Sequence, residues 1–215
     1  MLQILMIRHG AVHADWAGRL YGALDVPLSS EGHAQARAVA RELREEPLAA
    51  VVSSGLSRAE FTANLLRSDR PGLERIDRPR LAERNRGDWA GWTLAEIETR
   101  HPGAGELWEA SHGRFTPPGG ESLADVQARV TAEIDRLAEE HRGGQIAIVA
   151  HLWVVRAAVA AAIGLPADGV GAISMPTSGR ARIQWRPGGA GARGRLIEMH
   201  GTPPVRAEDR VTESV

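Results

Sequence analysis

The 215-residue sequence contains no cysteine, which excludes disulfides, thiolate metal sites and a cysteine nucleophile. It contains no lysine either, so all 26 basic residues are arginines. The presence of an arginine therefore says little here, and its position in the fold is what counts. The formal net charge of −1 gives no indication of a broad basic surface for nucleic acid.

Long apolar runs are also missing. The apolar N-terminal segment Met1 to Ile7 ends at Arg8, which makes it shorter than a signal-peptide core or a membrane span. We therefore expect a cytoplasmic protein with no membrane partner. An apolar fraction of 43% and a charged fraction of 25% are typical of a soluble globular domain.

Short apolar runs alternate along the chain with amphipathic stretches. The predicted strands are 3–7, 49–53, 73–76, 145–150, 172–175, 180–185 and 195–199, and the predicted helices are 29–46, 55–66, 122–141 and 152–163. Continuous apolar runs are typical of strands that are buried on both faces, as in parallel sheets. The pattern predicts a three-layer α/β/α sandwich with a mainly parallel central sheet.

We expect a single domain over residues 1–201, followed by a polar and loose tail over 202–215. Within the domain, residues 81–121 form an irregular stretch rich in Trp, Gly and Pro, with short helices expected near 94–100 and 106–111. This stretch resembles an insertion that covers one edge of the sheet. We expect this lid to carry the substrate specificity.

Two predicted strands end at a histidine. Strand 3–7 runs into Arg8-His9-Gly10, and strand 145–150 runs into His151. Ligands of open α/β sheets bind beyond the carboxyl ends of the strands. A third strand leads to Arg58 in the first turn of a helix, where free backbone N–H groups favour anions. Guanidinium groups match phosphate oxygens well, so this edge is a candidate phosphate site.

At this point the motifs resemble those of the histidine phosphatase superfamily, in its phosphoglycerate-mutase-like branch. In chain order they are Arg8-His9-Gly10, then Gly18 to Gly22 and Asp25 to Ser29 with Gln35, then Ser53 to Ala59, then Leu81-Ala82-Glu83 with Gly87 to Gly91, and finally Pro118 to Ser122 with Val149-Ala150-His151. Any one of these motifs is a weak signal. Their common order from residue 8 to residue 151 makes the resemblance specific.

The resemblance implies a phosphomonoester hydrolase that passes through a phosphohistidine on His9. It implies that Arg8, Arg58 and His151 hold the phosphoryl oxygens and that Glu83 is the general acid and base. The residues Asp15, Tyr21, Gly22 and Leu152 would line the phosphate pocket and its rim. No metal and no organic cofactor is implied. The expected partner is a small phosphomonoester, and a homodimer is one option for the oligomeric state.

Within the branch, the lid motifs look most like those of α-ribazole phosphatases and general small-metabolite phosphatases, so α-ribazole 5′-phosphate is a candidate substrate. A phosphoglycerate mutase is an alternative, although the short middle segment argues against it. A non-catalytic phosphate-binding protein is a second alternative. A metal site on His9 and His13 is disfavoured, because Gly10 makes a shared helix face improbable.

Three positions depart from the usual form of the branch. Ala11-Val12 replace an acidic residue and a Ser or Thr, Asp15 stands where an Asn is common, and Leu152-Trp153 replace small residues. A carboxylate at Asp15 would repel phosphate unless it faces away or pairs with Arg19. Solvated charges are the default expectation for Arg84 and Arg86, with contact to a second anionic group as the alternative.

Overall fold

The computed structural model describes residues 1–188 and 191–210 and contains one six-stranded sheet with the order β3-β2-β4-β1-β5-β6. The strands are β1 Leu2–Arg8, β2 Ala50–Ser53, β3 Glu74–Asp77, β4 Gln145–Ala150, β5 Arg180–Trp185 and β6 Gly194–His200. The first four in this series run parallel to one another, while β5 pairs antiparallel with both β1 and β6. The predicted mainly parallel sheet is confirmed.

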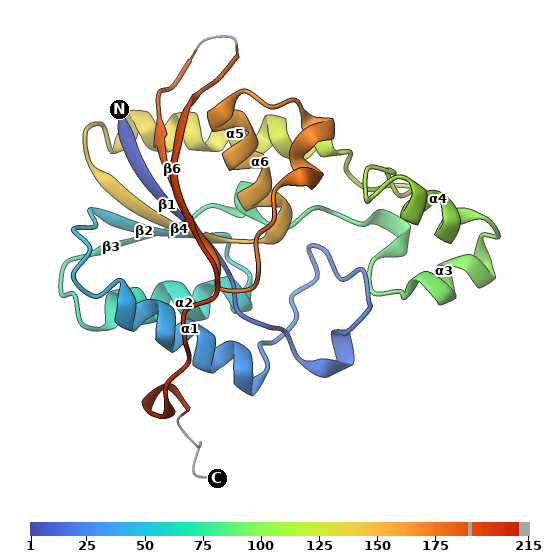
Figure 1. Cartoon of the computed structure of the whole chain (residues 1–215), viewed down its shortest axis with the longest axis horizontal. Coiled ribbons are helices and arrows are strands. Elements are labelled where there is room, and N and C mark those ends of the chain that lie inside the picture. The colour runs from blue at the N-terminus through green and yellow to red at the C-terminus, as the bar shows by residue number, and fades with distance from the viewer. Residues whose placement is uncertain (189–190, 211–215) are drawn as a thin grey trace.

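Helices cover both faces of the sheet (Figure 1). The helices α1 (Ser30–Glu42) and α2 (Ser57–Ser68) lie on one face, and α5 (Leu123–Glu140) and α6 (Leu152–Ile163) lie on the other. Successive residues of a strand point to opposite faces. Accordingly, Leu5 and Ile7 belong to the core under α1 and α2, whereas Ile4 and Met6 belong to the core under α5 and α6. The three-layer prediction is confirmed.

The strand register brings the ends of β1, β2 and β4 to one edge. Arg8 on β1 lies opposite Ala150 on β4, and Ser53 on β2 lies opposite Val149. The residues that follow these positions therefore leave the sheet side by side. This edge receives His9, His151 and the start of α2.

The loop after β1 is held against the start of α1. Ser29 caps the helix by accepting a hydrogen bond from the Gly32 N–H at 3.0 Å, and the Ala11 N–H donates to Gln35 Oε1 at 2.9 Å. A Cβ atom on Gly32 would collide with the Ala11 carbonyl. The close approach of helix and loop fixes the backbone directly after His9.

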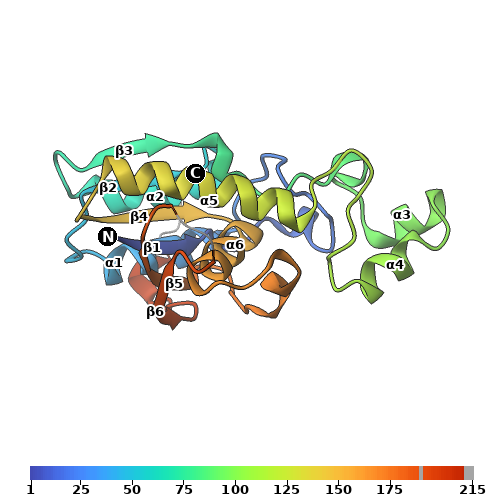
Figure 2. The same ribbon diagram turned by 90° about the horizontal axis from the view of Figure 1, so that it is seen from above.

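The segment 81–121 folds around its own small core. Its helices are α3 (Leu94–Arg100), as predicted, and α4 (Ala104–Ala110), which begins two residues before the predicted position. The buried Trp89 stacks on Phe115 with ring centroids 5.1 Å apart, and Trp108 packs edge-on against it. Both views show α3 and α4 projecting from one end of the molecule (Figures 1 and 2).

The strand predicted over 172–175 is wrong. The chain instead forms a 3-10 helix at Ala167–Ala172 and continues without regular structure to β5. Two carbonyl groups of this segment accept hydrogen bonds from arginine side chains, Ile173 from Arg156 Nε at 2.6 Å and Met175 from Arg8 Nη1 at 2.7 Å. These contacts replace the strand pairing.

The expectation of a loose tail is also wrong for its described part, residues 202–210. Asp209 is buried and forms an ion pair with Arg41 of α1, and its carbonyl accepts a hydrogen bond from Arg37 at 3.1 Å. Arg210 pairs with Glu31 at 3.0 Å. The rest of the predicted tail, residues 211–215, lies outside the described residues.

No helix within 1–188 and 191–210 combines the length and the apolar character that a membrane crossing requires.

Candidate active site

His9 is buried directly after β1, with 2% of its surface exposed. Its Nδ1 lies 2.7 Å from the Gly10 carbonyl oxygen, which can only accept a hydrogen bond. The proton of the neutral ring therefore sits on Nδ1, and Nε2 carries a free lone pair. Burial, together with the charges of Arg58 and Arg8, lowers the pKa of His9 to about 3. The ring is thus neutral and nucleophilic around pH 7.

His151 follows β4 and faces His9, with the ring centroids 5.1 Å apart. Its Nε2 lies 2.7 Å from Ser54 Oγ, while its Nδ1 is buried without a hydrogen-bond partner. Ser54 Oγ already accepts the Leu56 N–H at 3.3 Å, which leaves its proton available for His151. If Ser54 donates to Nε2, the ring proton sits on Nδ1 and can be donated to a bound oxygen. Burial and the neighbouring His9 lower the pKa of His151 well below its ordinary value.

Two arginines face the histidine pair. Arg58, in the first turn of α2, is fully buried and donates to the carbonyls of Gly22 at 2.8 Å and Leu24 at 2.7 Å. Arg8 donates to Met175, and the Nε atoms of both arginines are buried without a partner. Burial lowers the pKa of each guanidinium, and the charge of Glu83 opposes the shift. Both side chains are held in place by backbone carbonyls and keep donors for an anion.

Glu83 is buried at the edge of the site, with 7% of its surface exposed. Its Oε1 accepts hydrogen bonds from the Arg84 N–H at 2.8 Å and from the Trp153 N–H, in the first turn of α6, at 3.3 Å. The described residues leave Oε2 without a hydrogen bond. A carboxyl group fixed on one oxygen and free on the other suits a proton donor that also accepts.

Tyr21 and Gly22 form the loop that closes the site on the side of Arg58. The Arg58 guanidinium lies over the Tyr21 ring, 5.4 Å from its centroid, and burial raises the pKa of the Tyr21 hydroxyl. Gly22 has a φ of 50°, and a Cβ there would lie 2.6 Å from the Arg84 carbonyl oxygen and from Arg86 Cγ. Only glycine fits this close approach of two loops.

Asp15 was expected at the phosphate pocket or its rim, but its side chain contacts none of the other predicted site residues. Its side chain is 81% exposed and lies 3.2 Å from His13, whereas Arg19 pairs with Glu96 at 2.9 Å. The carboxylate therefore faces solvent, which removes the expected repulsion of a phosphate. Leu152 is half-buried and packs against the core under α5 and α6.

Sequence reasoning gave no role in the site to Ser54 or Trp153. Ser54 was part of a motif but had no role assigned, and only the strand register places it beside His151. Trp153, noted only as a departure from the branch, is buried beneath the lid. Arg86 is also buried, which contradicts the default expectation of a solvated charge but not the alternative of contact with a second anionic group. Ser54 directly precedes the GLSR stretch and Arg86 lies within ERNRGDW, but nothing in the spacing of either stretch indicates burial.

Arg84 was likewise expected to be solvated, and this is wrong. The side chain is fully buried and donates to three backbone carbonyls, those of Glu121, Gly113 and Phe115. It therefore ties distant parts of the lid segment to one another. No group of three or more His, Cys, Asp or Glu side chains in the described parts of the chain is arranged to hold a metal ion.

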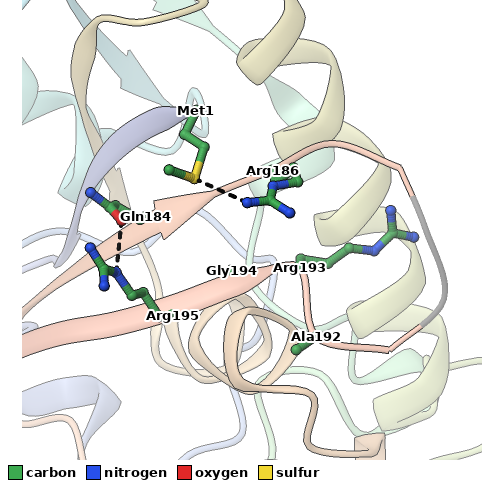
Figure 3. A pocket seen from close by; sticks show the side chains of 7 residues that line it. All are labelled: Met1, Gln184, Arg186, Ala192, Arg193, Gly194 and Arg195. Carbon is green, nitrogen blue, oxygen red and sulfur yellow. Dashed lines mark hydrogen bonds between the residues drawn. The ribbon is translucent and has the colours of Figure 1, made fainter.

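A hollow at the opposite end of β1 is lined by Met1, by Gln184 of β5 and by three arginines of β6 and the β5–β6 connection (Figure 3). Arg195 donates to Gln184 at 2.7 Å, Arg186 contacts the Met1 sulfur at 3.8 Å, and Arg193 pairs with Asp135 at 3.1 Å. These guanidiniums already have partners within the protein. The candidate active site is therefore the carboxyl edge of the sheet.

Comparison with known proteins agrees with this geometry. The chain is 35% identical over 173 residues to a glucosyl-3-phosphoglycerate phosphatase of Mycolicibacterium vanbaalenii, which covers 77% of this chain and 76% of the relative. It is 32% identical over 165 residues to phosphoserine phosphatase 1 of Hydrogenobacter thermophilus, covering 77% and 78%. The solved α-ribazole phosphatase of Shigella flexneri superposes with a TM-score of 0.77 at 27% identity, covering 91% of this chain and 99% of that one.

The sequence profile of the histidine phosphatase superfamily (branch 1) matches residues 4–195, which include every residue of the candidate site. With the two phosphatase relatives, this match confirms the resemblance that the motifs indicated. The chain belongs to the histidine phosphatase superfamily, branch 1.

Proposed function

We propose that this enzyme hydrolyses small phosphomonoesters through a phosphohistidine formed on His9. The observation that carries the proposal is the state of His9: its ring is buried and neutral, Nδ1 is tied to the Gly10 carbonyl, and Nε2 is free beside Arg8 and Arg58. A neutral imidazole with a fixed lone pair is an activated nucleophile. The two guanidiniums balance the charge of a phosphoryl group in the same place.

The reaction takes two steps. His9 Nε2 attacks phosphorus as the bond to the ester oxygen breaks, and Glu83 gives its proton to the leaving alkoxide. Glu83, now ionised, then takes a proton from a water molecule that attacks phosphorus and breaks the P–N bond to His9. Inorganic phosphate leaves, and His9 and Glu83 return to their starting states. Arg8, Arg58 and the Nδ1–H of His151 stabilise the oxygens in both steps.

The names of the relatives support a class of substrates and not a single compound. α-Ribazole 5′-phosphate is supported by the lid motifs and by the Shigella flexneri structure. The names of the other two relatives add glucosyl-3-phosphoglycerate and phosphoserine. We propose a small phosphorylated metabolite from this group as the substrate, to be found in a screen that includes all three.

The first experiment measures hydrolysis of p-nitrophenyl phosphate in EDTA between pH 5 and 8, with wild type, His9→Ala and the control His200→Ala. His200 is an exposed histidine of β6 far along the chain from the site. Wild type and the control should turn over, and should trap an acid-labile, alkali-stable label from a radioactive phosphoester. His9→Ala should do neither.

If the His9→Ala protein still traps the acid-labile label, the assignment of His9 as the nucleophile is refuted. Inactivity of the folded wild type on every ester would favour the non-catalytic alternative instead. Rapid isomerisation of 3-phosphoglycerate would favour the mutase alternative; we expect that rate to be negligible.

A further inference from the structure

Arg86 is a buried cation without a partner. Only 7% of its surface is exposed, and its Nε and Nη1 atoms have no hydrogen-bond partner. It forms no ion pair with any residue in 1–188 or 191–210. A buried polar group without a partner is costly, and a buried charge more so. Such a side chain in a binding site points to a ligand group that satisfies it.

Arg86 lies beside the reacting groups. Its Cγ is 2.6 Å from the position a Cβ of Gly22 would take, and the Gly22 carbonyl is the one that holds Arg58. Burial lowers the pKa of Arg86, and the charge of Glu83 acts on Arg86 and opposes this lowering. Because Glu83 serves the leaving group, Arg86 faces the part of the substrate that carries the ester oxygen.

Arg84 gives the internal comparison. Both guanidiniums are buried in the same segment, yet Arg84 is saturated by the carbonyls of Glu121, Gly113 and Phe115. Burial and the neighbouring Arg86 lower the pKa of Arg84 to about 10. Arg84 thus has a structural explanation, whereas the described residues give the Arg86 guanidinium neither a hydrogen bond nor an ion pair.

Two tryptophans fix the direction of Arg86. Its Cζ lies 5.1 Å from the ring centroid of Trp108 in the lid and 5.8 Å from that of Trp153 on α6. Aromatic faces hold a guanidinium by cation–π attraction without occupying its hydrogen-bond donors. The side chain is therefore held in one orientation before a ligand arrives.

The nearby carboxylates are committed elsewhere. Glu121 receives Arg129 Nε at 2.6 Å and the Asn85 N–H at 2.8 Å. Glu83 accepts backbone N–H groups on Oε1 and keeps Oε2 for proton transfer. Neither forms an ion pair with Arg86, so the counter-charge has to come from the substrate.

We propose that Arg86 binds a carboxylate on the alcohol part of the substrate, so that the enzyme prefers phosphomonoesters of hydroxy acids to phosphomonoesters of neutral alcohols. This inference rests on the proposed function. The phosphoryl group has its own donors in Arg8, Arg58 and His151, which leaves Arg86 for a second anionic group. A guanidinium recognises a carboxylate through charge-assisted hydrogen bonds that a neutral hydroxyl cannot match.

The test compares 3-phosphoglycerate with glycerol 3-phosphate, which differ only in a carboxylate against a CH₂OH group. Wild type should show the higher kcat/KM for 3-phosphoglycerate. Arg86→Leu should reduce this preference roughly 10- to 100-fold, the effect of losing one buried charge-assisted hydrogen bond. Arg86→Lys should keep part of it. The control Arg114→Leu, at an exposed lid arginine, should keep all of it.

An equal loss for both esters in Arg86→Leu would overturn the proposal and place Arg86 on the phosphoryl group or in the folding of the lid. A wild type that prefers glycerol 3-phosphate or α-ribazole 5′-phosphate would also overturn it. Thermal melting identifies variants that fail to fold.

The subsite can be tested without turnover. Calorimetry on His9→Ala should give tighter binding of 3-phosphoglycerate than of glycerol 3-phosphate, and the added change Arg86→Leu should remove the difference. This result would stand if the phosphohistidine mechanism failed. Equal affinities in His9→Ala would refute the carboxylate site while leaving the hydrolase proposal intact.

Discussion

At the residue scale, the two histidines of the site contact the protein through different ring atoms, His9 through Nδ1 and His151 through Nε2. In His9 the Gly10 carbonyl holds the proton on Nδ1 and frees Nε2 to attack. In His151, Nε2 lies against the Ser54 hydroxyl, and a hydrogen bond donated by Ser54 would place the ring proton on Nδ1, which has no protein partner. One imidazole is thereby prepared to give an electron pair and the other to give a hydrogen bond. Neither role requires a charged ring.

Glu83→Gln tests the proton transfer at this scale. The amide keeps the size and the acceptor oxygen for the Arg84 and Trp153 N–H groups but cannot donate a proton to an alkoxide. We expect the pre-steady-state rate constant for release of the alcohol to fall about 100-fold or more with glycerol 3-phosphate, and far less with p-nitrophenyl phosphate, which has a good leaving group. Steady-state kcat should fall with both esters wherever the second step is limiting, because Glu83 also takes the proton of the attacking water. Burst kinetics should separate the two steps.

An equal loss in this pre-steady-state rate constant with good and poor leaving groups would mean that Glu83 does not protonate the ester oxygen. Glu121→Gln serves as the control, because this carboxylate is bound by Arg129 and Asn85. Its effect should not depend on the leaving group.

At the scale of elements, the start of α6 joins the site to the lid. The Trp153 N–H donates to Glu83, while the Trp153 ring is buried and lies against Gly113 of the lid. Arg84 and Arg156 approach the same ring, with Cζ at 5.5 Å and 4.9 Å from its centroid. One residue thus positions the acid through its backbone and the lid through its side chain.

Trp153→Ala should therefore loosen the lid. We expect the free energy of unfolding to fall by about 3 kcal/mol, as for other buried large aromatic residues. Amide hydrogen exchange over 104–116 should accelerate more than exchange in the sheet, because those residues lose the surface against which they pack. The control Trp16→Ala removes a half-buried tryptophan outside α6 and should leave exchange over 104–116 unchanged. Unchanged amide exchange over 104–116 in Trp153→Ala would show that contacts within the lid, such as those of Arg84, keep it ordered without Trp153.

The same elements show what a sequence can predict. The strands β1, β2 and β4 are continuous apolar runs, and the residues after them were expected at one edge because parallel strands end together. The lid has no such periodicity, since its order comes from tryptophan packing and from arginine contacts with distant carbonyls. The strand predicted over 172–175 was wrong for the same reason, because arginine contacts with backbone carbonyls order this segment.

Burial of polar groups was the other limit. Nothing in the sequence distinguishes Arg84 and Arg86 from the solvated arginines of this chain. Only the folded lid shows that these two side chains are buried. Asp209 was expected in a loose tail because its partner Arg41 is 168 residues away in the chain. Long-range ion pairs of this kind have no local signal.

At the scale of the whole molecule, arginine side chains connect loops by donating hydrogen bonds to their backbone carbonyls. Arg58 holds the loop at Gly22 and Leu24, Arg8 and Arg156 hold the segment before β5, and Arg84 holds the lid. A guanidinium has several donors in a fixed plane, so one side chain can bind two or three carbonyls. The absence of lysine is consistent with this use. The site arginines therefore support the fold at the same place where we propose that they bind the phosphoryl group.

The buried histidines should make stability depend on pH. Folding lowers the pKa of His9 to about 3 and that of His151 well below its ordinary value of 6.5. Below pH 6.5 the unfolded chain therefore binds protons that the folded chain does not, and stability falls with pH. Each histidine should remove about 1 kcal/mol of the free energy of unfolding between pH 6.5 and 5.5, approaching 1.4 kcal/mol per further pH unit.

Urea unfolding at pH 7, 6.5, 6 and 5.5 measures this dependence. Carboxylates with lowered pKa values, such as Glu46, lose their contribution as pH falls through their folded pKa, below the ordinary value of 4.5, so they contribute little in this window. His151→Gln removes one titrating ring while keeping an amide that can accept from Ser54, and it should halve the slope. The control His200→Ala removes an exposed ring and should leave the slope unchanged. A stability that is flat from pH 7 to 5.5 in wild type would mean that both rings accept protons in the folded state, and the neutral nucleophile at His9 would then have to be abandoned.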